Sequence, residues 1–210
     1  MKNLQTWVAT AAMVALTGAV QAAPVFQGRL ANGTASSTCT VSGATKCAMF
    51  YNTTLDITIL NDWNIGRGVW SDTAAPGSAQ ALAAAAGATQ TDFTGWFLPT
   101  GAGGQGAGAQ NQYLSIWNDV GGTLAGLQAL FDGVQSNVYW SGTEYAPNPS
   151  FAWGFSTSGG FWNVANKGDA WYAVAVRPGD VTASVPEPQA LALALLALGA
   201  TVVARRRRSR

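Results

Sequence analysis

The chain has 210 residues, of which only 10% are charged, and it contains 25 glycines, nine tryptophans and no histidine. This length fits one domain together with targeting segments. Without histidine the chain lacks the commonest general base and the commonest ligand of transition metals. Between residues 23 and 180 there are five basic and nine acidic side chains, and a net charge of −4 argues against nucleic-acid binding.

The first 22 residues have the pattern of a secretory signal peptide. Lys2 supplies the positive start, residues 7–20 form a short apolar stretch, and Val20-Gln21-Ala22 provides small residues before a cleavage site. We therefore predict cleavage between Ala22 and Ala23 and export of the remaining chain. The alternative is a retained N-terminal anchor, which the short apolar run disfavours.

Residues 23–47 are polar and have no regular hydrophobic period, which predicts a loop or weakly ordered leader. They contain the only two cysteines, Cys39 and Cys47. In an exported protein, two cysteines this close together favour one disulfide that closes a small loop. A metal site is disfavoured because two thiolates alone do not complete a tetrahedral shell.

The next part of the chain alternates between strand and helix patterns. Short strands are predicted at 49–51 and 55–60, where apolar residues alternate with polar ones. An alanine-rich helix should begin after Ser78 as its N-cap and stop at Gly87. Residues 100–109, rich in Gly, Ala and Gln, predict a mobile surface loop. Two further short helices are expected at 110–118 and 123–131, and strands of one antiparallel sheet at 138–140, 151–155, 160–164 and 170–177.

Four motifs follow one another in a recognisable order: residues 51–64, Gly95-Trp96-Phe97-Leu98-Pro99-Thr100, residues 139–145 and residues 166–179. Together they resemble the Lcl C-terminal-like domain family, which is similar to C-type-lectin-like domains and to formylglycine-generating enzymes. The resemblance covers about residues 48–180. It implies an α+β, C-type-lectin-like single domain with an antiparallel sheet and two or three short helices. The family usually has an arginine where this chain has Phe97, so the ion pair of that arginine should be absent or replaced by packing.

The segment 181–210 combines a rigid motif, an apolar run and a basic end. This order resembles the PEP-CTERM sorting signal of bacterial exported proteins, which implies processing by an exosortase-type membrane protease. Residues 190–204 would rise about 22 Å as a helix against a hydrocarbon core of about 30 Å, so a short transmembrane helix is predicted at 189–204, with its arginines cytoplasmic. The alternative is a plain single-pass anchor. The sorting prediction rests on Pro186, Glu187, Pro188, Arg205, Arg206, Arg207 and Arg208.

Aromatic side chains of the later strands are the candidate ligand contacts. Exposed aromatic rings beside Asn and Asp form a common surface for stacking on sugars, whereas packing in the core is the alternative for each ring. The candidate ligand-facing residues are Trp140, Tyr145, Asn148, Trp153, Trp162 and Trp171.

Calcium binding and catalysis have little support in the sequence. The Trp117-Asn118-Asp119 and Ala146-Pro147-Asn148 segments occur in the reverse of the order that C-type lectins use for calcium, so no metal is predicted. No phosphate loop is present, no cofactor is expected, and residues 48–180 lack the cysteines on which formylglycine-generating enzymes depend. Arg177 is expected to form an ion pair that closes the last strand. Asp62, Asp119, Glu144 and Asp169 could supply some of the oxygen ligands that calcium needs, but the sequence does not show that they converge.

These features predict an exported bacterial protein of the cell surface or extracellular matrix. It would be held transiently in the inner membrane by its tail and would bind polysaccharide or envelope components without catalysis. One alternative is a purely structural matrix scaffold. The other is a divergent formylglycine-generating-enzyme-like enzyme, for which Glu144 and Asp169 are the only candidate catalytic carboxylates.

Overall fold

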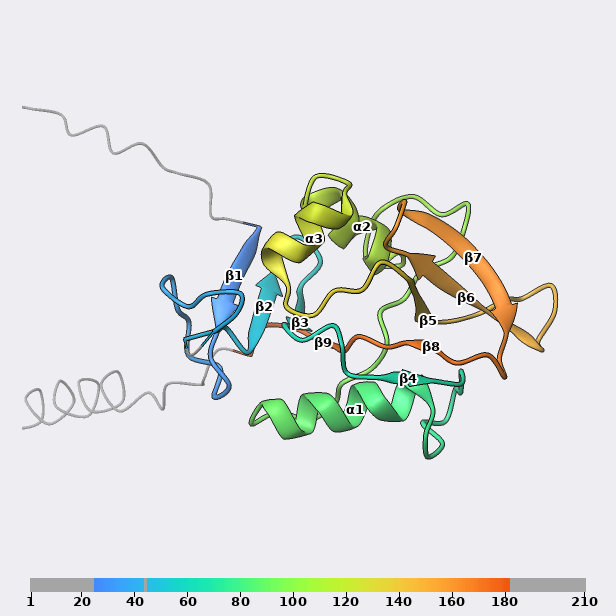
Figure 1. The fold of residues 1–210 in the computed structure, drawn as a ribbon, viewed down its shortest axis with the longest axis horizontal. Helices are drawn as coiled ribbons and strands as arrows, with labels where there is room; N and C mark the ends of the chain where they lie inside the picture. Colours follow the sequence, from blue (N-terminus) through green and yellow to red (C-terminus); the bar gives the residue numbers. More distant parts are fainter. Residues whose placement is uncertain (1–24, 44, 182–210) are drawn as a thin grey trace, which may run out of the picture.

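The structure is a computed structural model that describes residues 25–43 and 45–181 (Figure 1). These residues form three helices and two β-sheets, which confirms the α+β class. The predicted signal peptide at 1–22, its cleavage site and the tail with its 189–204 helix lie outside the described residues. Within the described residues, no helix combines the length and hydropathy needed to cross a membrane.

The first sheet joins the beginning of the domain to its end. Its four antiparallel strands are ordered β1-β2-β3-β9, and their bounds are Phe26–Arg29, Met49–Asn52, Ile57–Leu60 and Val176–Pro178. The prediction that residues 23–47 form only a leader is therefore wrong for β1, which belongs to the sheet. The ring of Phe26 packs edge-on against Phe131, with centroids 5.9 Å apart, so tertiary contact stabilises a strand that carries only one large apolar side chain.

The predicted disulfide between Cys39 and Cys47 is present. It lies directly against β1 at Gly28. A Cβ atom at this glycine would stand 2.6 Å from Cys39 Sγ and 2.8 Å from Cys47 Sγ, which no side chain tolerates. Cys47 is itself buried in the core. The disulfide therefore fastens the otherwise irregular segment 30–46 to the face of the first sheet.

The second sheet has five strands in the order β4-β8-β5-β6-β7. Only the β5–β8 pair is parallel. The prediction of one antiparallel sheet is wrong, because residues 170–177 divide between β8 in this sheet and β9 in the other. Residues 173–175 between these two strands are fully buried, and their continuous apolar run contains no turn signal that would mark the change of sheet. The strand bounds are Arg67–Gly68, Trp171–Tyr172, Val138–Glu144, Phe151–Ser156 and Phe161–Asn166.

The strands lie between helix α1 on one side of the molecule and helices α2 and α3 on the other (Figure 1). Helix α1 spans Ala79–Gln90, and its N-cap is Ser78, whose side chain accepts a hydrogen bond from Ala81 N at 3.1 Å. The predicted stop at Gly87 is wrong, because the helix continues for three more residues. Helix α2 spans Gln112–Asp119 and helix α3 spans Leu124–Leu130, near their predicted positions.

Aromatic rings fill the space between the sheets and the two short helices. Trp63 is 1% exposed, and its ring centroid lies 4.9 Å from Phe131, 5.5 Å from Tyr139 and 6.3 Å from Tyr113. These residues come from four separate parts of the chain. Residues 25–43 and 45–181 thus contain both sheets and the core that they share.

Candidate ligand-binding surface

One face of the second sheet carries the aromatic side chains that reach the surface. In β6, Phe151, Trp153 and Phe155 point to the same side, because side chains alternate along a strand. The register with β7 sets Trp153 opposite Val164 and Phe155 opposite Trp162. Tyr145, directly after β5, contacts Trp153 on this face. The half-buried residues Tyr145, Trp153 and Trp162 are called the aromatic surface below.

The rings of the aromatic surface continue into the core. The Tyr145 and Trp153 centroids are 5.2 Å apart at 81°, and those of Trp153 and Trp162 are 6.2 Å apart at 83°. Trp162 then meets the buried ring of Phe155 at 5.1 Å, and Phe155 stacks on Tyr113 at 5.5 Å. Edge-to-face contacts of this kind are favourable beyond the area that they bury. The outermost ring of this series is therefore held by an unbroken line of aromatic neighbours.

The glycine-rich segment 100–109 packs against these tryptophans. A Cβ atom at Gly103 would lie 2.8 Å from Trp153 Cζ3, and one at Gly101 would lie 2.3 Å from Trp162 Cη2. Gly101 N donates to Thr143 Oγ1 at 3.1 Å, and Ser141 Oγ donates to the Gly101 carbonyl at 2.9 Å. The prediction of a mobile surface loop is wrong for residues 101–103. Glycine is required there because the backbone approaches the indole rings too closely for a side chain.

Two of the six candidate residues lie on the opposite face of the sheet. Trp140 is 0% exposed and its Nε1 donates to the Gly68 carbonyl at 3.0 Å, so the prediction that it faces a ligand is wrong. Trp171 stacks on Trp140 with centroids 4.3 Å apart and covers Gly154 of β6. Trp171 lies on a strand but packs over a glycine of the same sheet, so a tryptophan on a strand need not face solvent. The predicted set is therefore divided between two faces.

Asn148 lies in the exposed turn that connects β5 to β6, beside the aromatic surface. Its backbone N–H donates to the Tyr145 carbonyl at 2.9 Å, and its side-chain Oδ1 accepts from Ser150 N at 3.0 Å. These two bonds fix the turn and orient the side-chain amide. The remaining NH₂ group can donate to a ligand hydroxyl.

The acidic residues do not gather near this surface. Glu144 pairs with Lys167, Asp119 accepts from Asn52 Nδ2 at 2.9 Å, and Asp62 accepts from Gln90 Nε2 at 3.2 Å. Asp169 lies exposed in the turn after β7. Among the residues that the structure describes, no three acidic or cysteine side chains converge as a metal site would require. Glu144, Asp119 and Asp62 each have a basic or amide partner, and none of these contacts joins one carboxylate to another.

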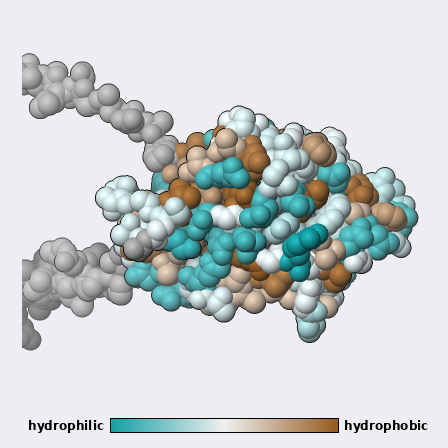
Figure 2. Space-filling model, in the orientation of Figure 1, coloured by the Kyte–Doolittle hydropathy of each residue, from teal (hydrophilic) through white to brown (hydrophobic). Residues whose placement is uncertain are grey.

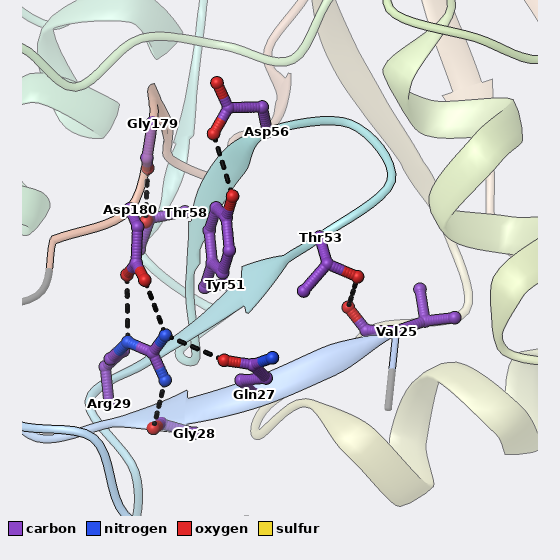
Figure 3. Close-up of polar contacts among 10 residues, drawn as sticks. All are labelled: Val25, Gln27, Gly28, Arg29, Tyr51, Thr53, Asp56, Thr58, Gly179 and Asp180. Atoms are coloured by element: carbon purple, nitrogen blue, oxygen red, sulfur yellow. Dashed lines mark hydrogen bonds and ion pairs between the residues drawn. The ribbon is translucent and has the colours of Figure 1, made fainter. Parts of the chain in front are cut away.

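Arg177 does not make the ion pair expected from the sequence with any described residue. Its guanidinium carbon lies 5.1 Å from the centre of the Phe93 ring, and its Nε and Nη1 atoms are buried without a hydrogen-bond partner in the described part of the chain. The end of the domain is instead closed by Arg29 and Asp180 (Figure 3). Arg29 was not considered for this role, because the sequence did not predict that its segment forms a strand of the first sheet.

A pocket of about 570 Å³ lies elsewhere and is bordered by β1, residues 35–37 and the two cysteines. Its walls include Phe26, Phe50 and the cystine sulfurs, and the guanidinium of Arg29 is already occupied by Asp180. It thus offers apolar walls but no available charge to select a ligand. On the face drawn in Figure 2, apolar residues form separate patches rather than one continuous area. We therefore retain the aromatic surface as the candidate site.

The chain matches no family model, and no curated protein is significantly similar to it. The case for a function consequently rests on the geometry and on the motif resemblances.

Proposed function

We propose that this is an exported bacterial surface or matrix protein whose domain binds polysaccharide without catalysing a reaction. The observation that carries the proposal is the arrangement of Trp153. Its indole is half-buried between the perpendicular rings of Tyr145 and Trp162, and Gly103 supports it from the loop side. An aromatic ring held in this way loses little freedom when a ligand stacks on it.

The chemistry of the surface fits sugars better than charged ligands. The apolar C–H face of a pyranose ring can stack on the indole of Trp153 and on the ring of Tyr145. The exposed amide of Asn148 can bond a hydroxyl group, and the adjacent charges of Glu144 and Lys167 neutralise each other. The resemblance of residues 48–180 to C-type-lectin-like domains supports the same ligand class.

A protein of residues 23–181, secreted so that the disulfide forms, should be tested on a glycan array. Calorimetry then measures its affinity for each polysaccharide that binds. We expect Trp153→Ala to abolish binding and Trp153→Phe to retain part of it. Tyr51→Ala is the matched control, because Tyr51 is a half-buried surface aromatic of the other sheet. Absence of binding by the unmodified domain to every polysaccharide would overturn the function, and full binding by Trp153→Ala would overturn the assigned surface.

For the tail, we propose that an exosortase-type protease recognises Pro186-Glu187-Pro188 while residues 189–204 hold the protein in the inner membrane. The support is the motif order and the basic end, Arg205 to Arg208. Replacing the three motif residues with alanine should leave an uncleaved, membrane-retained protein in cell fractionation. Unchanged processing would instead favour a plain single-pass anchor.

A further inference from the structure

Strand β7, residues Phe161–Asn166, forms one edge of the five-stranded sheet. Its six residues, Phe-Trp-Asn-Val-Ala-Asn, contain no charge and no proline. Edge strands are usually protected from pairing with another chain by lysine, proline or a bulge, and β7 has none of these within its length. The β6–β7 register is continuous from Phe151 to Ser156. The edge is therefore regular, uncharged and free of proline along the whole strand.

The hydrogen-bonding pattern shows which backbone groups of β7 point away from β6. Lys167 N donates to the Ser150 carbonyl at 3.0 Å, so these two residues form a hydrogen-bonded pair. Because such pairs alternate along antiparallel strands, Ala165, Asn163 and Phe161 also bond to β6. The N–H and C=O groups of Trp162, Val164 and Asn166 then point outward, and the Asn166 carbonyl already accepts a hydrogen bond from Asp169 N at 2.9 Å. Val164 is at the centre of this outward row.

The outward row is complementary to a second copy of itself. In an antiparallel pair centred on Val164, this residue faces its own copy, and Trp162 faces Asn166 of the second copy. Each outward N–H then meets an outward C=O, which is the condition for a closed twofold interface. The Asn166 carbonyl, which already accepts from Asp169 N, would use its second lone pair for this contact. Apolar side chains are exposed beside the row: Phe161 is 52% exposed and Val164 is 37% exposed.

We propose that β7 pairs with β7 of a second copy of this chain about a twofold axis at Val164, which joins the two five-stranded sheets into one. The interface is small, so the dimer is weak and depends on protein concentration. Because Val164 is opposite Trp153, the pairing brings the aromatic surfaces of both copies onto one continuous sheet face. The proposal does not require that these surfaces bind sugar.

Sedimentation equilibrium of residues 23–181 across a wide concentration range, without ligand, tests the pairing. We expect a concentration-dependent dimer that Val164→Lys weakens by at least about tenfold, since two like charges would lie directly opposite each other. Val164→Pro should weaken it similarly, because it removes an outward N–H that β6 does not use. The matched control is Val69→Lys. Val69 is 40% exposed, which is close to the exposure of Val164, but it does not lie on β7, so this substitution should leave the dimer intact.

Cross-linking provides a readout that does not depend on how well the lysine and proline variants fold. Residues directly opposite in a hydrogen-bonded antiparallel pair have Cα atoms about 5.5 Å apart, within the range of a disulfide. Mild oxidation should therefore link V164C into covalent dimers, while A146C, in the exposed turn before β6, should remain mainly monomeric. A protein that stays monomeric at millimolar concentration, or a dimer that persists in the Val164→Lys and Val164→Pro variants, would overturn the proposal. Loss of sugar binding alone would not affect it.

Discussion

Arg29 of β1 and Asp180, two residues after the end of β9, form a bidentate ion pair (Figure 3). Arg29 Nε donates to Asp180 Oδ1 at 2.9 Å and Nη2 to Oδ2 at 2.6 Å. The guanidinium also donates to Gln27 Oε1 and to the Gly28 carbonyl, both at 3.0 Å. Only 3% of the Arg29 side chain is exposed. The pair joins positions 151 residues apart and closes the first sheet across its outer strands.

Asp180→Ala should lower the free energy of unfolding by about 2–4 kcal/mol, because it leaves the buried guanidinium of Arg29 without its counter-ion. Urea denaturation of residues 23–181 measures the change. Lys46→Ala is the control, since its ion pair with Asp132 is 44% and 36% exposed and should contribute no more than about 1 kcal/mol. Equal effects of the two substitutions would show that the Arg29–Asp180 pair does not close the domain.

Gly87→Ala should destabilise the protein although alanine is the better helix former. In an exposed helix the substitution would gain about 1 kcal/mol, but here the new Cβ would lie 2.1 Å from Trp96 Cγ. Overpacking of this kind costs about 1–3 kcal/mol, so the clash prevails. Thermal denaturation should show a lower Tm. The converse change at the exposed neighbour, Ala88→Gly, should cost only about 1 kcal/mol, and a higher Tm for Gly87→Ala would contradict the packing against Trp96.

Gly103→Ala should displace the Trp153 indole and thereby change the aromatic surface. Its Cβ would lie 2.8 Å from Cζ3 and 2.9 Å from Cη2 of Trp153. The expected readouts are an altered near-ultraviolet circular dichroism spectrum and weaker binding of any polysaccharide that the domain recognises. Gly106→Ala is a close control from the same segment, because its Cβ would meet nothing within 4 Å. If both variants keep the spectrum of the unmodified domain, the loop does not support the indole.

Stability should fall at alkaline pH because two core tyrosines are buried. Tyr113 donates to the Trp140 carbonyl at 3.1 Å, Tyr139 donates to the Trp63 carbonyl at 3.1 Å, and burial raises the pKa of both hydroxyls. The folded state thus favours the protonated form. The stability that burial of the two hydroxyls contributes is complete below the pKa of an unfolded tyrosine, which is about 10. As the pH rises above that value, the free energy of unfolding falls by up to about 1.4 kcal/mol per pH unit for each tyrosine.

Urea denaturation at a series of pH values from about 8 to 11.5 tests this dependence, with tyrosinate absorbance recorded in parallel. The absorbance of these two residues should appear only with unfolding. A constant free energy of unfolding over the whole range would contradict the burial of their hydroxyls.

Local features of the fold could be read from the sequence. Ser78 caps α1 because its hydroxyl accepts a backbone N–H within one turn. The strand at 57–60 follows from the alternation of apolar residues, and the disulfide follows from the presence of only two cysteines in an exported chain. The candidate surface was only partly predicted: Tyr145, Trp153 and Asn148 do lie together, whereas Trp140 is buried on the opposite face.

The features that the sequence could not supply all depend on contacts between distant residues. Alternation along β5 and β6 does not reveal which face a loop will cover, and only folding brings Gly103 onto Trp153. The glycine-rich composition that predicts mobility equally permits close backbone approach to an indole ring.

By itself, then, the sequence determined the N-cap of α1, the cystine and the aromatic character of the later strands, because each arises from residues close together in the chain, and the motif resemblance indicated the α+β class. The tertiary structure alone decided that β1 completes the first sheet, that residues 170–177 serve both sheets, and that β7 is left as an open edge. The physical reason is that the local sequence pattern permits several arrangements of these segments. Contacts between distant residues, such as the ion pair of Arg29 with Asp180, select one of them.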